Sequence, residues 1–103
     1  MKTKNFKTYL ESRLSEQEIS DIENEARIEF EALKALQQDV SNTINEYMLE
    51  KNHGFNDFVR EMGKSPSQVS KIMKGEANIT LGTLAQIYAV MGMKPHITYE
   101  RVS

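Results

Sequence analysis

The chain has 103 residues, of which 39% are hydrophobic and 27% charged, and its formal net charge is −2. That length allows one compact domain with a modest core and an appended helix, and the composition is ordinary for a globular protein. The absence of cysteine excludes disulfides and thiolate metal sites and favours a reducing cytoplasm. Because the first residues lack a long apolar run, we expect neither a signal peptide nor a membrane span.

The charge is distributed unevenly along the chain. Residues 1–52 hold seven basic and eleven acidic residues, net −4, whereas residues 53–96 hold five basic and three acidic residues, net +2. Two regions of opposite sign indicate two kinds of partner. A solvated surface helix that is rich in acidic residues would give the same pattern.

The first predicted element is an amphipathic helix that begins with a capping box. Ser15 and Glu18 have the spacing of that motif, in which the serine oxygen accepts from an early helical N–H group. Apolar residues then recur every three or four positions and form one stripe. The stripe consists of Ile19, Ile22, Ala26, Phe30 and Leu33. It must pack on the rest of the domain, on a second copy or on another protein.

The apolar period continues as far as Met48. Either Asp39 or Ser41 caps a new helix, or the helix runs unbroken across residues 37–41, and the sequence leaves both alternatives open. The Asn-His-Gly segment at residues 52–54 ends this helical region, because Asn and Gly suit a left-handed exit.

Three shorter helices follow, and glycines or caps delimit each of them. Residues 55–62 form the first. The second begins at Ser65, where Ser-Pro-Ser-Gln supplies an N-cap, a proline at the first helical position and a glutamine at the third, and it ends at Gly75. The third is capped by Thr80 and ends at Gly92.

The last residues change in character. Residues 96–102 are β-branched and aromatic, which predicts one strand. Because the chain shows no other strand, we expect Ile97, Thr98 and Tyr99 to pair with the same segment of a second chain.

The helix that begins at Ser65 has one face without a carboxylate. If Val69 is the centre of its buried side, Ile72 and Met73 fall beside it at 3.6 residues per turn. The opposite side carries Ser67, Lys71 and Lys74, flanked by Gln68 and Ser70. Such residues bind base edges and phosphates, although any solvated helix face can contain them.

Residues 40–93 resemble the XRE (phage-repressor/Cro-like) helix-turn-helix family. The residues that carry the resemblance are Phe58-Val59, residues 62–75 (MGKSPSQVSKIMKG), residues 78–85 (NITLGTLA) and Met91-Gly92. The chain departs from the family at Gly54-Phe55, where the family often has Ser/Thr-Gln, and at Val59, where alanine is usual. At the first of these positions the family's glutamine normally makes a phosphate contact.

The resemblance implies an all-α fold, in which a four- to five-helix lambda-repressor-like domain carries an N-terminal amphipathic helical extension and a short C-terminal β-strand. We expect the extension at residues 1–37, the DNA-binding domain at 38–94 and the strand, as a dimer contact, at 95–103. The resemblance further implies binding to double-stranded operator DNA. Because so few residues are basic, we expect a two-fold homodimer that reads two half-sites. The family's contact positions fall on Ser65, Pro66, Ser67, Gln68, Lys71 and Lys74, to which the flanking Ser70 is added.

An acidic helix before such a domain and a strand after it are similar to the architecture of HigA-type antitoxins of type II toxin–antitoxin modules. This similarity implies a small basic ribonuclease toxin as the partner of residues 16–36, and repression of the protein's own operon. A stand-alone bacterial or phage regulator and a protein-binding adaptor are the alternatives. Because the sequence shows no metal-ligand spacing, acid–base pair or phosphate loop, we expect no enzyme, cofactor or metal.

Overall fold

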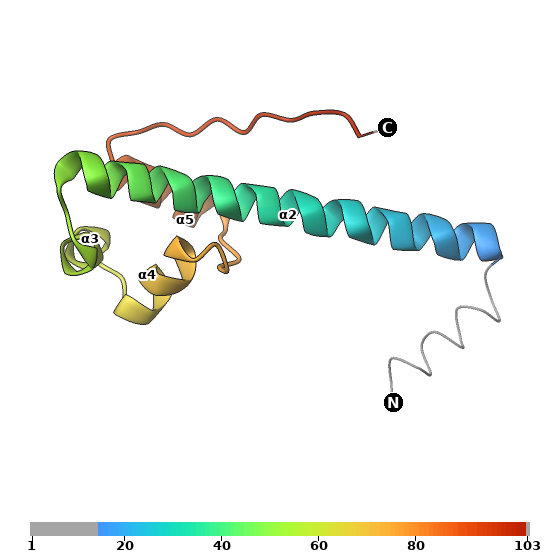
Figure 1. Cartoon of the computed structure of the whole chain (residues 1–103), viewed down its shortest axis with the longest axis horizontal. Coiled ribbons are helices and arrows are strands. Elements are labelled where there is room, and N and C mark those ends of the chain that lie inside the picture. Colours follow the sequence, from blue (N-terminus) through green and yellow to red (C-terminus); the bar gives the residue numbers. More distant parts are fainter. Residues whose placement is uncertain (1–14, 103) are drawn as a thin grey trace. The chain divides into compact units, whose positions relative to one another are not determined.

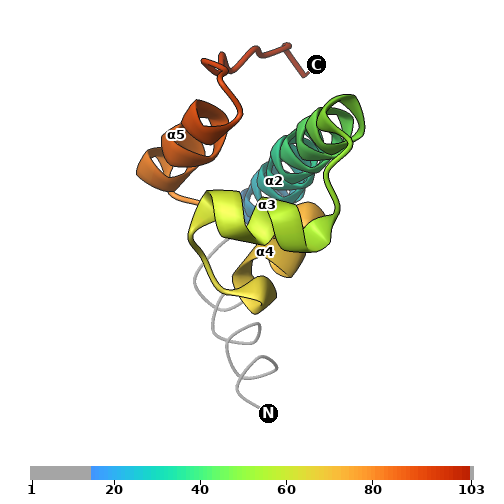
Figure 2. The ribbon, with the colours of Figure 1, turned by 90° about the vertical axis from the view of Figure 1, so that its left-hand side faces the viewer.

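A computed structural model of the chain describes residues 15–102, which form four α-helices and no β-strand. The helices are α2 (Glu16–Lys51), α3 (Phe55–Met62), α4 (Pro66–Met73) and α5 (Leu81–Val90). The chain divides into two compact units, residues 1–35 and 36–103. In the second unit, α3, α4 and α5 gather around the C-terminal part of α2 (Figures 1 and 2). The predicted all-α fold is confirmed; residues 1–14 of the expected extension and Ser103 of the expected strand lie outside the described range.

Helix α2 is unbroken over 36 residues, so the alternative of a new helix within residues 37–41 is excluded (Figure 1). Ser41 starts no helix; its hydroxyl donates to the carbonyl oxygen of Met73. At the N-terminus, Ser15 Oγ accepts from the Glu18 N–H at 3.1 Å, which is the serine half of the predicted capping box. The Glu18 carboxylate accepts from the Ser15 hydroxyl at 3.2 Å.

The core of the second unit takes one fully buried side chain from each helix. They are Ile44 of α2, Phe58 of α3, Val69 of α4 and Ile87 of α5. Each such side chain contributes about 1.5–3 kcal/mol through the removal of apolar surface from water. Val40, Tyr47, Ile72 and Met91 complete the buried apolar cluster. The inward face that the helical period predicts around Val69 and Ile72 is thereby confirmed.

A polar cluster joins the end of α2 to α3. The Tyr47 hydroxyl donates to Glu61 Oε2 at 2.9 Å, and His53 Nδ1 lies 2.8 Å from Glu61 Oε1. The Tyr47 ring also meets Phe58 edge-on, with the ring centroids 6.1 Å apart. The hydrogen bond to Glu61, burial and the negative charge of that carboxylate raise the pKa of Tyr47. The neutral phenol is therefore the form that the fold favours.

The predicted C-terminal strand is not formed. Residues 93–102 have no regular secondary structure, and Ile97, Thr98 and Tyr99 are exposed. A strand exists only through hydrogen bonds to a neighbouring strand, and residues 15–102 contain no second strand to supply them. The β-branched and aromatic composition of this segment was therefore not sufficient for strand formation in a single chain. Within the described residues, no helix is long and apolar enough to cross a membrane.

Candidate nucleic-acid interface

The short helix α4 is fixed at its N-terminus by a complete capping box. Ser65 Oγ accepts from the Gln68 N–H, and Gln68 Oε1 accepts from the Ser65 N–H, each at 3.2 Å. Proline at position 66 occupies the first turn, where no backbone donor is needed. Because the oxygen of Gln68 is used in the cap, its amide NH₂ group is the part of the side chain that remains for a ligand.

The two faces of α4 are those that the helical period predicts. Val69 is fully buried, Ile72 is 6% exposed and Met73 is half-buried. Of the predicted contact residues, Ser70 is half-buried, and the exposed ones are Ser65, Pro66, Ser67, Gln68, Lys71 and Lys74. The structure therefore places the predicted set on α4 and its two caps, with Ser70 the least accessible.

Helix α4 ends at a glycine with left-handed backbone. Lys74 is the C-cap, and Gly75 follows with φ +71°. A Cβ atom at this glycine would lie 3.5 Å from the carbonyl oxygen of Gln37 on α2, so the turn passes close to the α2 backbone. Glycine tolerates this conformation without steric cost.

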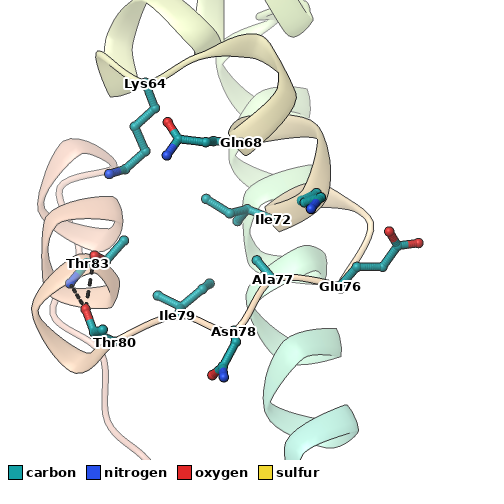
Figure 3. A pocket seen from close by; sticks show the side chains of 10 residues that line it. Lys64, Gln68, Ile72, Glu76, Ala77, Asn78, Ile79, Thr80 and Thr83 are labelled. Carbon is teal, nitrogen blue, oxygen red and sulfur yellow. Dashed lines mark hydrogen bonds between the residues drawn. The ribbon is translucent and has the colours of Figure 1, made fainter.

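A pocket of about 310 Å³ lies beside the exposed face of α4. Its lining comes from the turn before α4, from α4 itself, from the loop between α4 and α5 and from the start of α5. The lining residues are Lys64, Gln68, Lys71, Ile72, Glu76, Ala77, Asn78, Ile79, Thr80 and Thr83. Figure 3 shows Lys64 and Gln68 on one side and Thr80 and Thr83 across from them, while the Glu76 carboxylate points away from the pocket.

The far wall of the pocket is the N-terminal turn of α5. Thr80 Oγ1 accepts from the Thr83 N–H at 3.2 Å and donates to Thr83 Oγ1 at 3.1 Å (Figure 3). This is the cap that the sequence predicted at Thr80. The cap fixes the start of α5 and therefore the end of the loop that lines the pocket.

The pocket includes polar residues that the sequence reasoning did not select. Lys64, Asn78 and Thr80 lie outside α4, yet they share a pocket with Gln68 and Lys71. They carried only a weak signal in the sequence, because polar residues are common in turns. Packing of both α4 and α5 against α3 is what brings them together.

The profile of the Cro/C1-type helix-turn-helix DNA-binding domain matches residues 43–96. The chain belongs to this family. The Cro/C1-type match includes all of α3, α4 and α5 and therefore the whole pocket. No curated protein and no solved structure matches the chain significantly. The resemblance to XRE proteins is thereby confirmed, whereas the similarity to HigA-type antitoxins stays a prediction.

A second candidate surface lies outside the Cro/C1-type segment. On the N-terminal part of α2, the predicted stripe is largely accessible: Ile22 is 47%, Phe30 60% and Leu33 39% exposed, Ala26 is exposed and Ile19 is half-buried. Seven acidic residues and one arginine accompany this stripe between residues 16 and 31. Arg27 is paired with Glu31 at 2.9 Å. This surface thus combines exposed apolar side chains with excess negative charge.

Within residues 15–102, no group of three or more His, Cys, Asp or Glu side chains is placed to hold a metal ion. His53 contacts Glu61 at the junction of α2 and α3, and His96 is exposed in the C-terminal segment.

Proposed function

We propose that the protein is a sequence-specific transcriptional repressor that reads double-stranded DNA with α4, and that it is not an enzyme. The observation that carries this proposal is the outward face of α4 in a Cro/C1-type domain, where Ser67 and Lys71 are exposed and no carboxylate is present. Lys71 reads a guanine or neutralises a phosphate, and Ser67 and the Gln68 amide donate to base edges. Ser65 and Lys74 bind backbone phosphates at the two ends of the helix.

The pocket beside α4 extends this interface. Lys64, Asn78 and Thr80 supply a cation, an amide and a hydroxyl, the groups that typically hold phosphate oxygens. With so few cations one copy binds weakly, because affinity for DNA depends steeply on the number of neutralised phosphates. We therefore propose a homodimer that reads two half-sites one helical turn, about 34 Å, apart.

The finer role we propose is that of an antitoxin in a type II toxin–antitoxin module, acting in the cytoplasm and repressing its own operon. The support is the N-terminal part of α2, where an exposed apolar stripe lies within a net-negative segment. A small basic ribonuclease toxin would cover the apolar side chains and neutralise the acidic ones. A second copy of the same segment would bring like charges together, which is unfavourable.

The DNA-binding proposal is tested by selection from a random pool of 30-bp duplexes with the full-length protein. We expect one recurring sequence with two related half-sites. If no sequence is enriched at low salt, where phosphate contacts are strongest, the proposal is wrong.

The antitoxin proposal is tested with the product of a short open reading frame adjacent to the gene, provided that it is basic. We expect the full-length protein to restore growth when this product is expressed, and the double variant Phe30→Ser/Leu33→Ser to fail. Leu49→Ser is the matched control, since Leu49 is 81% exposed but lies outside the stripe. If the double variant protects as well as the wild type, or if no adjacent frame encodes a basic protein, the stand-alone regulator is the better description.

A further inference from the structure

Two polar side chains of α2 hold the segment that follows the exposed face of α4. Gln37 Nε2 donates to the carbonyl oxygen of Ala77 at 2.8 Å, and the Ser41 hydroxyl donates to the carbonyl oxygen of Met73. Both side chains are buried, with 8% of Gln37 and 5% of Ser41 exposed. The two bonds therefore tie the end of α4 and the loop after it to a rigid helix.

The burial of Gln37 carries a penalty. Its Oε1 is buried and has no hydrogen-bond partner among residues 15–102. A buried acceptor without a partner destabilises a fold, whereas methionine has a similar length and would fill the same space without that penalty. A polar residue at such a position points to a role in fixing the place of the group that it bonds, here the Ala77 carbonyl oxygen.

The geometry that these bonds fix belongs to the pocket beside α4. Ala77 lines the pocket, and Asn78 and Thr80 follow it along the same loop, across from Gln68 (Figure 3). Helix α4 itself is held by its buried residues and does not need the two bonds. The loop packs Ala77 and Ile79 against the core, and the bond from Gln37 to Ala77 is the hydrogen bond that ties it to α2.

We propose that Gln37 and Ser41 are positioning residues for DNA binding. They hold residues 73–77 against α2, so that Asn78 and Thr80 reach the DNA backbone while Lys71 occupies the groove. This inference rests on the proposed function, because it assumes that the exposed face of α4 is the DNA-binding face. Without the Gln37 bond the loop loses its hydrogen bond to α2, and without the Ser41 bond Met73, the residue before the loop, loses its own; α4 stays folded through Val69 and Ile72.

The test compares Gln37→Met with Gln38→Met in the full-length protein. Gln38 is the matched control, since it is exposed on α2 and bonds only Asn42 on the same helix. The probe is the duplex that the wild type selects from the random pool. Affinity is measured over a salt series at a temperature where circular dichroism shows every variant fully folded, so that a change in stability alone leaves affinity unchanged.

For Gln37→Met we expect an unfolding temperature close to that of the wild type, because removal of the unpartnered acceptor offsets loss of the hydrogen bond to the Ala77 carbonyl oxygen. We expect affinity to fall about tenfold and the salt slope to become shallower by about 0.9, the contribution of one phosphate contact. Ser41→Ala is the second variant, and it carries the test if Gln37→Met does not fold. It should show the same loss of affinity and of slope, whereas Gln38→Met should behave as the wild type.

Wild-type affinity and salt slope in a folded Gln37→Met protein, or in Ser41→Ala if the first variant does not fold, would overturn the inference. A loss of affinity that Gln38→Met shares would overturn it as well. Lys71→Ala separates this failure from failure of the proposed function. If Lys71→Ala binds as the wild type does, the DNA-binding face is misassigned; if it binds weakly while the Gln37 and Ser41 variants do not, only the positioning role is wrong.

Discussion

The N-cap of α4 allows the stability of the fold and the affinity for DNA to be varied separately. In Ser65→Ala the Gln68 N–H loses its acceptor, which lies 3.2 Å away in the wild type. Loss of a serine cap costs about 1 kcal/mol, within a range of about 0.5–2. For a domain of this size, 1 kcal/mol lowers Tm by roughly 4–8 °C. Thermal unfolding followed by circular dichroism measures the shift.

Two further variants complete this experiment. Ser67→Ala removes an exposed hydroxyl within the same helix but no cap, and it should leave Tm unchanged or slightly higher, because alanine favours helix. Ser65→Asp should recover Tm, since aspartate caps as well as serine, yet bind DNA more weakly because it adds a carboxylate at the interface. Equal Tm values for Ser65→Ala and the wild type would refute the capping argument. If Ser65→Asp binds DNA as tightly as the wild type does, this cap does not lie at the DNA interface.

Three further predictions concern the core and the polar clusters around α3. Phe58→Ala should lower the free energy of unfolding by about 3–5 kcal/mol, a large part of the 5–15 kcal/mol typical of a domain. Urea denaturation measures this change, and an unchanged midpoint would contradict the assigned core. Tyr47→Phe removes the hydrogen bond to Glu61 and should cost about 1 kcal/mol in the same assay. Because the pKa of Tyr47 is raised in the fold, the contribution of Tyr47 to the free energy of unfolding is present below pH 10, the ordinary tyrosine pKa, and is lost as pH rises through the folded pKa. Tyr47→Phe should lack this loss of stability at alkaline pH. The Gly54 N–H donates to Asp57 at 3.0 Å, and together with the charge of Arg60 it lowers the pKa of Asp57. The contribution of Asp57 to the free energy of unfolding is therefore present above about pH 3.8 and is lost as pH falls through the folded pKa. Asp57→Asn should therefore show a shallower loss of stability in acid, and an acid profile equal to that of the wild type would contradict this assignment.

The elements with local end signals were predictable from the sequence. Ser65 and Thr80 mark the beginnings of α4 and α5 because capping depends on residues only three apart, and Gly75 ends α4 because its positive φ suits glycine. The inward and outward faces of α4 followed from the helical period. The C-terminal strand failed because a strand depends on a partner that composition cannot supply.

Contacts between distant parts of the chain could not be predicted. The sequence allows Ser41 as a helix cap, yet it lies inside α2 and bonds Met73, 32 residues away. The helical period places Gln37, and not Gln38, on the same side as Val40 and Ile44, but no pattern in the sequence shows that its amide bonds the Ala77 carbonyl oxygen. Lys64 likewise has no distinguishing signal in the sequence, because the packing of α4 and α5 against α3 is what places it across a pocket from Thr80.

The most direct test of DNA recognition by α4 is the dependence of affinity on salt. Fluorescence anisotropy with the selected duplex should give a slope of log K against log salt that is shallower by about 0.9 for Lys71→Ala and by about 1.8 for Lys71→Ala/Lys74→Ala. Lys34→Ala, which removes an exposed lysine of α2 outside the Cro/C1-type segment, should leave the slope unchanged. A double variant with the wild-type slope would contradict the claim that the exposed face of α4 binds DNA.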